Sequence, residues 1–128
     1  MEIQNIRNLL LIFIGGGIGS VCRYGLGAYM LSSTVNRFPL PTFIANTLGC
    51  LCIGLLMGYF SNRPTNILYL LFVTGFCGGF TTFSTFSNET FQFVRQGMYA
   101  LALSYVLLSF FVGLLSVALG FYLCKNVV

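Results

Sequence analysis

A short stretch in the second half of the chain carries most of the side chains that could hold a small ion. Residues 75–90 read GFCGGFTTFSTFSNET and combine glycines, phenylalanines, hydroxyls and one of the two acidic residues of the protein. Phe80, Phe83 and Phe86 recur every three residues, and the hydroxyls of the adjacent stripe are Thr81, Ser84 and Ser87. A phenyl ring has a positive edge, so rings turned edge-on favour an anion, and hydroxyls donate hydrogen bonds that replace water around it. Phenylalanines at helical spacing are also typical of simple packing against lipid or a neighbouring helix, and the pattern alone leaves both interpretations open.

Composition indicates that these side chains belong to a membrane protein. Of the 128 residues, 57% are hydrophobic and 6% are charged, whereas a soluble domain carries roughly 25% charged residues. A membrane span needs about 20 apolar residues, and four runs qualify, at residues 8–31, 42–60, 66 to about 83, and 98–124. The first run could instead be a secretory signal peptide, but Arg23 lies near its end and it lacks an A-x-A cleavage site. The sequence therefore predicts an all-α membrane protein with four transmembrane helices, in a single domain of residues 1–128.

The glycine-rich start of residues 75–90 predicts a break in the third helix. Three closely spaced glycines followed by the β-branched Thr81 and Thr82 make a poor continuous helix. A helix broken inside a membrane leaves carbonyl and N–H groups that protein, water or an ion must satisfy, and many transporters build their ion sites in this way. We therefore expect a break over residues 78–84 and a second half-helix over about residues 85–95.

Polar side chains inside the other apolar runs are costly in a membrane, and each is a candidate for function. Arg23 could be an anchor that reaches the interface, or a fixed cation that concentrates anions in a vestibule. Asn46 could join two helices or present its amide N–H groups to a ligand. Tyr105 and Ser109 lie four residues apart and share a helix face, although such hydroxyls often bond their own backbone. The chain has no His and no second acid in its apolar runs, so no catalytic set can be assembled and an enzyme is not expected.

The distribution of positive charge bears on orientation. With four spans, Arg7, Arg63 and Lys125 share one side of the membrane, while Arg37 and Arg95 lie on the other. Three against two is too small a difference to orient a chain by the positive-inside rule, so we expect insertion in both orientations. Small residues let helices pack closely, which favours a homo-oligomer. Glycines four or eight residues apart, expected on one helix face, occur in the first two runs at Gly15, Gly19, Gly27, Gly54 and Gly58. These patterns permit an antiparallel dimer. The single basic residues form no stripe, so nucleic acid binding is not expected.

Two other classes of membrane protein fit four short spans. A small dual-topology multidrug exporter would need a carboxylate inside its first span to exchange protons for a cationic drug, and that run has none. A purely structural membrane protein would explain the glycines but not the stripe of rings and hydroxyls. The five cysteines are odd in number and lack His or acidic neighbours, which favours small buried hydrophobes over disulfides or a metal site.

The chain resembles the CrcB/Fluc family of bacterial fluoride channels. The resemblance covers essentially the whole length and the four-span layout, and its most specific motif is GFCGGFTTFSTFSNE. The segments GGGIGSVCRY in the first run and NTLGCLCIG in the second support it. The family implies an antiparallel, dual-topology homodimer in the bacterial inner membrane, with two pores through which cytoplasmic fluoride leaves passively.

The resemblance also implies roles for individual residues. Phe83 and Phe86 would turn their ring edges to the pore, and Asn46 would hydrogen-bond the permeating fluoride. Arg23 would lie in the aqueous vestibule. Hydroxyls would continue the pathway as a polar track, with candidates at Thr82, Ser84, Thr85, Tyr105 and Ser109.

Two further implications concern the break and the acid beside it. Backbone carbonyls of Gly78 and Thr81 from each subunit would hold a structural sodium ion on the dimer axis. That ion would satisfy the broken backbone. Glu89 matches the acid that follows the phenylalanine motif in the family, and its role stays open.

Overall fold

The computed structural model describes residues 3–31, 38–61 and 67–125, and its described elements are helical. Four spans are long and apolar enough to cross a membrane, which confirms the prediction of a multi-pass, all-α protein. These spans are Asn5–Met30, Leu40–Phe60, Ile67–Arg95 and Tyr99–Lys125. Arg37 and Arg63, which entered the argument about orientation, lie outside the described residues.

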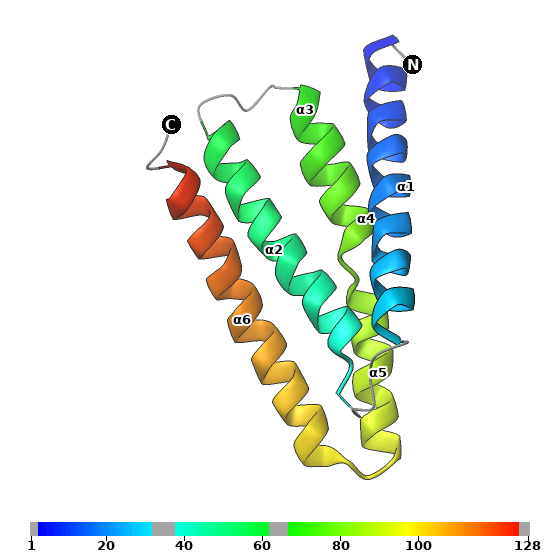
Figure 1. Ribbon diagram of the computed structural model, residues 1–128. Coiled ribbons are helices and arrows are strands. Elements are labelled where there is room, and N and C mark those ends of the chain that lie inside the picture. The colour runs from blue at the N-terminus through cyan, green and yellow to red at the C-terminus, as the bar shows by residue number, and fades with distance from the viewer. Residues whose placement is uncertain (1–2, 32–37, 62–66, 126–128) are drawn as a thin grey trace.

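Three of the spans are single helices and the third is composite. The single helices are α1 (Ile3–Leu31), α2 (Leu40–Phe60) and α6 (Tyr99–Lys125). The third span consists of α3 (Ile67–Tyr69), the π-helix η1 (Leu70–Cys77), α4 (Gly78–Phe80) and, after a break, α5 (Phe83–Arg95). Figure 1 shows the break as a narrow segment between α4 and α5, and it places the start of α1 and the end of α6 at the same end of the bundle.

Local sequence favours the start of α2 and the end of α5 where the structure has them. Pro41 lies in the first turn of α2, where its missing N–H costs no intrahelical hydrogen bond. Arg95 lies in the last turn of α5, where a cation complements the helix dipole. Gly97 then adopts a φ of 72°, a conformation that glycine tolerates best, and the chain reverses into α6.

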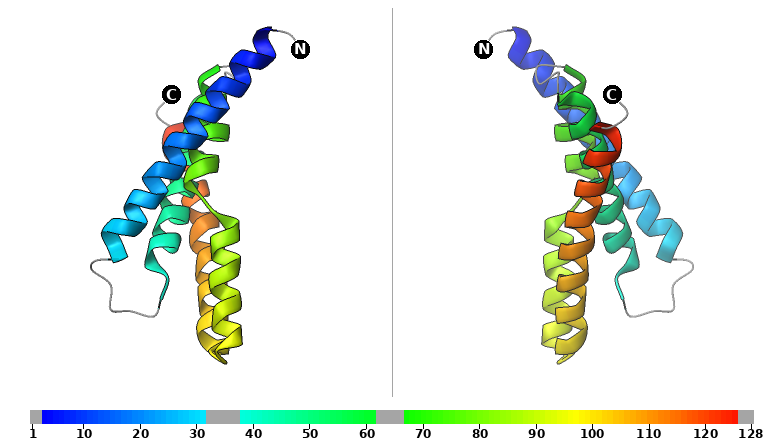
Figure 2. Two further views of the ribbon diagram at one scale, coloured as in Figure 1. Left: turned by 90° about the vertical axis from the view of Figure 1, so that its right-hand side faces the viewer. Right: turned by 90° about the vertical axis from the view of Figure 1, so that its left-hand side faces the viewer.

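Two close helix contacts hold the chain together. α1 lies against η1 and α4, and α2 lies against α6. A Cβ at Gly19 would collide with the Phe76 carbonyl, and one at Gly54 would collide with the Val117 carbonyl, so the predicted small-residue contacts are confirmed there. Gly27, expected on the same face as Gly19, instead has open space around it within this chain. From the side, α1 diverges from α5 and accompanies only the part of the third span before the break (Figure 2).

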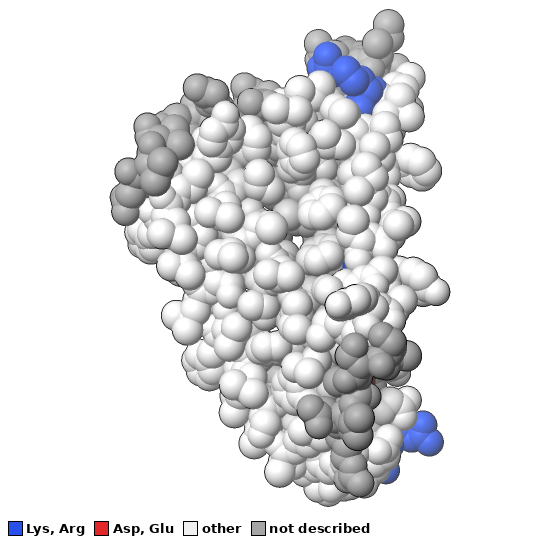
Figure 3. Space-filling view, in the orientation of Figure 1, with Lys and Arg blue, Asp and Glu red and all other residues white. Residues whose placement is uncertain are grey.

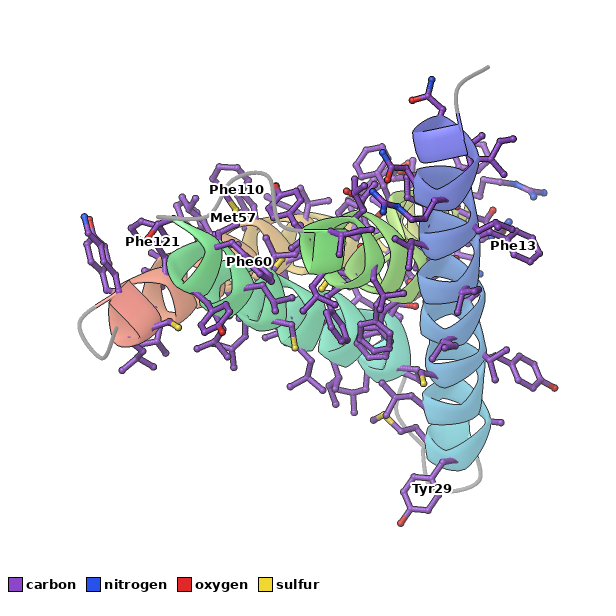
Figure 4. All side chains as sticks on the ribbon, turned by 90° about the horizontal axis from the view of Figure 1, so that it is seen from above. Phe13, Tyr29, Met57, Phe60, Phe110 and Phe121 are labelled. Carbon is purple, nitrogen blue, oxygen red and sulfur yellow. The ribbon has the colours of Figure 1, made fainter. Side chains whose placement is uncertain are left out.

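Most of the surface that one chain presents is apolar. Within each span, 6% to 22% of the apolar window is buried inside the chain. The face in Figure 3 carries its basic residues mainly toward two ends, with uncharged side chains between them. Figure 4 shows Phe13 and Tyr29 pointing outward from α1, where their side chains are 78% and 77% exposed. Such a surface requires lipid or another protein surface around it.

Candidate functional site

The third span is interrupted at two residues. Thr81 (φ −81°, ψ 157°) and Thr82 (φ −150°, ψ 118°) are extended, between the helical Phe80 and Phe83. The predicted break is confirmed, but it is narrower than residues 78–84, and α5 begins two residues earlier than expected. The reason is local, because the Thr82 hydroxyl accepts a hydrogen bond from the Thr85 backbone N–H at 3.3 Å and thereby caps α5.

Asn46 of α2 holds the extended Thr82 at two points. Its Oδ1 accepts a hydrogen bond from the Thr82 backbone N–H at 2.7 Å, and its Nδ2 donates to the Thr82 carbonyl at 3.1 Å. In a continuous helix, that N–H would bond the Gly78 carbonyl instead. Asn46 therefore joins two spans, as one of the two predicted interpretations has it. The amide carries two N–H groups, and this contact uses one of them.

Two other carbonyls just before the break, one at the end of η1 and one in α4, are satisfied by different means. The Cys77 carbonyl accepts hydrogen bonds from the backbone N–H of Thr81 at 3.0 Å and from the hydroxyl of Thr81 at 2.8 Å. The Gly79 carbonyl accepts hydrogen bonds from two side chains of α1, namely Ser20 Oγ at 3.4 Å and Arg23 Nε at 3.2 Å. Arg23 is partly buried, and its hydrogen bond to Gly79 places its Nε at the break.

A groove of about 490 Å³ opens beside the break, between α2, α5 and α6. Its walls are mostly apolar, with a few polar atoms among them. Its lining residues are Asn46, Cys50, Ile53, Thr81, Thr82, Phe83, Phe86, Val106, Ser109 and Phe110. Five of the eight predicted pathway residues thus meet in one groove. Among the described residues, Ser109 Oγ is the one buried side-chain polar atom without a hydrogen-bond partner.

The two predicted pore rings differ in their surroundings. Phe83 is 79% exposed within this chain, whereas Phe86 is partly buried. Their ring centroids lie 5.9 Å apart at an interplanar angle of 42°. Phe86 also contacts the buried Tyr105, with ring centroids 5.0 Å apart. Phe86 is therefore held in place by its own chain, while Phe83 projects from it.

Glu89 lies at the centre of a hydrogen-bonded group that joins three helices. Thr42 Oγ1 of α2 donates to Glu89 Oε1 at 2.7 Å, and the Tyr105 hydroxyl of α6 donates to Glu89 Oε2 at 2.7 Å. Tyr105 is fully buried and Thr42 is 7% exposed. Both carboxyl oxygens are thus engaged by hydroxyls, in short hydrogen bonds of the kind that an ionised acceptor strengthens.

The predicted hydroxyl track divides into three groups within one chain. The Thr82 hydroxyl lies 3.3 Å from that of Ser84 and donates to that of Thr85 at 3.1 Å, so these three gather at the start of α5. Tyr105 belongs to the Glu89 group. Ser109 stands in the groove between the other lining residues.

Comparison with known proteins shows to which family the chain belongs. The family model described as CrcB-like protein, Camphor Resistance (CrcB), matches residues 10–121. A protein of Phocaeicola vulgatus named fluoride-specific ion channel FluC is 43% identical over 121 residues, which cover 94% of this chain and 100% of that protein. The chain belongs to the CrcB family. Two further relatives with the same name are 41% identical over 122 residues in Azobacteroides pseudotrichonymphae and 44% identical over 121 residues in Methylobacillus flagellatus. Those alignments cover 94% and 91% of this chain, and 98% and 94% of the relatives.

Membership of the CrcB family confirms that the chain is not an enzyme, because its curated relatives are named as channels. In the described part of the chain, no three His, Cys, Asp or Glu side chains gather where they could hold a metal ion. The five cysteines are free. Their interpretation as buried hydrophobes is right for Cys77 and wrong for Cys22, which is exposed.

Two residues of the site were not among the predicted candidates. Thr42 lies four residues before Asn46 and therefore on the same face of α2, which is a signal that the sequence contains. Ser20 lies three residues before Arg23 on α1 and shares its acceptor. Both belong to networks whose partners are distant in sequence, so the hydroxyls alone did not single them out.

Proposed function

We propose that this protein is a fluoride-selective, passive anion channel that exports cytoplasmic fluoride. Its curated relatives carry the name fluoride-specific ion channel over almost the full length of this chain. The observation that supports the proposal most is the groove beside the break, which combines phenyl rings with the buried Ser109 hydroxyl. A buried polar group without a partner is costly. An anion that accepts a hydrogen bond from the Ser109 hydroxyl removes that cost.

Four kinds of donor meet a fluoride ion in this groove. The second N–H of Asn46 and the hydroxyl of Ser109 donate hydrogen bonds. Phe83 and Phe86 turn their positive ring edges toward the ion. Apart from the Thr85 N–H, which the Thr82 hydroxyl caps, the first N–H groups of α5 have no intrahelical partner, and a helix N-terminus favours an anion. The hydroxyls at the start of α5 then extend the path from the groove.

The Glu89 group reaches Phe86 through Tyr105, whose hydroxyl bonds Glu89 and whose ring contacts that of Phe86. In the proposed pathway, Glu89 holds the hydroxyls of Thr42 and Tyr105 in fixed positions along α5. Tyr105 packs against the ring of Phe86, so the group also sets the angle at which this ring meets the ion. Glu89 is thus a positioning residue in this account.

Selectivity follows from the size of the ion and the placement of donors. Fluoride is the smallest halide and the strongest hydrogen-bond acceptor among them, so it gains most from a narrow file of closely spaced donors. Chloride is larger and gains less from each bond. Pore width and donor placement then decide between the two ions.

A complete pore requires a second copy of the chain in this proposal. Phe83 is 79% exposed and the four spans bury little of their own surface. The charge pattern of the sequence permits insertion in both orientations, and an inverted homodimer would cover these surfaces and create two equivalent pores. In such a dimer, the partner would cover the exposed side of the Phe83 ring and close the groove that this ring lines.

A sodium ion on the dimer axis fits the carbonyls at the break. The Gly78 carbonyl loses its helical donor because the Thr82 N–H goes to Asn46, and Thr81 is extended. Hard cations take several oxygen ligands, including backbone carbonyls. Two carbonyls of one chain supply part of such a set, and the partner would supply the rest. The ion's positive charge would stabilise carbonyl oxygens that face one another.

Export needs no energy source in this proposal. Neutral HF enters an acid-exposed bacterial cell and dissociates, and the negative interior drives the fluoride anion out by about 2.3 kcal/mol per charge per 100 mV. The channel would lie in the bacterial inner membrane. The cation of Arg23 at a vestibule would raise the local anion concentration.

Efflux from proteoliposomes tests this function. Vesicles loaded with potassium fluoride or potassium chloride would receive valinomycin, and ion-selective electrodes would follow the anions. We expect rapid release of fluoride and no release of chloride. Release of neither ion, or of both at equal rates, would contradict the proposal. A multidrug exporter finds no support in the described residues, since α1 carries no carboxylate.

A further inference from the structure

The first helix reaches the break through two side chains that share one acceptor. Ser20 Oγ and Arg23 Nε both donate to the Gly79 carbonyl, at 3.4 Å and 3.2 Å, across 59 and 56 positions of sequence. Ser20 and Arg23 are three residues apart and therefore lie on one face of α1. Both hydrogen bonds are partly buried.

The Gly79 carbonyl needs these donors because the helix stops. In a continuous helix it would accept the N–H of Phe83, four residues later. Thr81 and Thr82 are extended, so that bond is absent, and a carbonyl without a partner cannot be left inside a membrane. The end of a helix also carries negative partial charge, which favours a guanidinium at this position.

Glycine contacts bring α1 close enough for both donors to reach. A Cβ at Gly79 would collide with the Gly16 carbonyl, and a Cβ at Gly19 would collide with the Phe76 carbonyl. The backbones of α1 and α4 are therefore in direct contact beside the break. A displacement of Gly79 along α1 would break the two hydrogen bonds and these contacts together.

We propose that Ser20 and Arg23 form a carbonyl clamp that fixes the position of the break, and that Arg23 acts as a positioning residue through Nε. Gly79 follows Gly78, whose carbonyl would face the sodium ion, and precedes Thr82, which Asn46 holds. The clamp on one side and Asn46 on the other fix both ends of the break. The consequence for fluoride passage rests on the proposed function, whereas the clamp itself does not.

Two substitutions of Arg23 separate its hydrogen bond from its charge. Gln carries an amide nitrogen at the same number of bonds from Cα as the Arg Nε, so Arg23→Gln keeps the donor and removes the charge. Lys has a methylene at that position and its ammonium one bond farther from Cα, so Arg23→Lys keeps the charge but has no N–H at the position of Nε. Ser20→Ala removes the second donor without changing any charge. Ser116→Ala is its control, because the Ser116 hydroxyl bonds the Val112 carbonyl of its own helix.

Amide hydrogen exchange of the segment 80–85, measured by mass spectrometry on the full-length protein in detergent, reports local opening of the break. We expect exchange about tenfold faster in Arg23→Lys, about threefold faster in Ser20→Ala, and unchanged in Arg23→Gln and Ser116→Ala. Exchange in α6 should be unchanged in all four variants. If Arg23→Lys yields no folded protein, Ser20→Ala against Ser116→Ala decides the question. Equal exchange in Arg23→Lys and Arg23→Gln, or in Ser20→Ala and the wild type, would overturn the clamp.

Fluoride efflux from the same variants adds a second readout. With the clamp, efflux should fall more in Arg23→Lys than in Arg23→Gln, because Arg23→Gln loses the charge of the vestibule cation but keeps the hydrogen bond to the break. A residue acting only as a vestibule cation gives the reverse order, and that order would overturn the positioning role. Absence of fluoride efflux from the wild-type protein would count against the proposed function alone, since the exchange measurement does not depend on conduction.

Discussion

The two halves of the third span are held in opposite ways. Before the break, η1 and α4 lie directly on α1, with glycines on both sides and little room for any side chain. After the break, α5 contacts α2 and α6 through side chains, including those of Phe86, Glu89 and Phe93. Its Phe83 projects away from the chain. One half is thus fixed through its backbone, and the other presents its side chains.

This difference suggests a division of labour. Before the break, backbone contacts with α1 fix the end of α4, so the carbonyls at that end point in defined directions. A half-helix held by polar side chains can offer rings and hydroxyls to an ion that moves past. The comparison predicts that substitutions before the break damage folding, while substitutions after it damage conduction with smaller effects on folding.

The largest effect is expected from Gly79→Val. The new side chain would collide with the Gly16 backbone, and relief would require α1 to separate from α4, at a cost of about 3 kcal/mol or more. We expect little or no monodisperse protein in size-exclusion chromatography. Gly78→Val is the matched control, because a Cβ at Gly78 meets nothing within 4 Å in this chain. It should fold but fail to assemble if the break binds sodium in a dimer. Normal yield and stability of Gly79→Val would contradict the rigid first half.

The next largest effect is expected from Asn46→Ala. The substitution leaves the N–H and the carbonyl of Thr82 without partners, which should lower the free energy of unfolding by about 2–4 kcal/mol. Fluoride efflux should fall at least about tenfold, since the groove loses a donor and its wall moves. Unfolding in detergent and efflux from vesicles measure the two effects. Asn88→Ala removes an exposed amide of α5 and should change stability by less than about 0.5 kcal/mol. Equal stability of the two variants would show that Asn46 does not hold the break.

Phe83→Ile should reduce conduction while leaving the fold intact. Most of the Phe83 side chain is exposed, so its removal costs this chain little, while the loss of a positive ring edge should lower fluoride efflux about tenfold. Phe86→Ile should lower efflux similarly and also cost about 1 kcal/mol, because that ring packs against Tyr105. The proposed dimer should persist in both variants. Wild-type efflux in both would exclude edge-on coordination as a requirement.

The smallest effect is expected from Ser109→Ala. The hydroxyl is buried without a partner among the described residues, so its removal should not lower the stability of the protein. Efflux should nevertheless fall severalfold, because the groove loses a donor. Ser104→Ala serves as the comparison, since the Ser104 hydroxyl bonds the Ala100 carbonyl of its own helix. Equal efflux in the two variants would remove Ser109 from the pathway.

Composition and local sequence were sufficient for the spans and the break. Long apolar runs are stable in a membrane as transmembrane helices, so four such runs predict four spans. Three glycines before two β-branched threonines weaken the third helix at that point, which predicts the break. The narrower break follows from Thr82, whose hydroxyl caps α5. An N-cap threonine three residues before Thr85 is a pattern that sequence contains, so this boundary could have been predicted more closely.

The tertiary hydrogen bonds could not be predicted from one sequence. The contacts of Thr42 and Tyr105 with Glu89 depend on the register of α2 and α6 against α5. The contact of Arg23 with Gly79 depends on how closely α1 approaches the break. Periodicity places a side chain on a helix face, but it does not say which neighbour that face meets.

The reversal potential of purified protein in a planar bilayer, with fluoride on one side and chloride on the other, tests the central claim most directly. A passive fluoride channel predicts a current that reverses far toward the fluoride equilibrium potential, and that loses most of its amplitude in Phe83→Ile. A reversal potential near zero, or a current that is the same in Phe83→Ile, would contradict the assignment of the groove as a fluoride pathway.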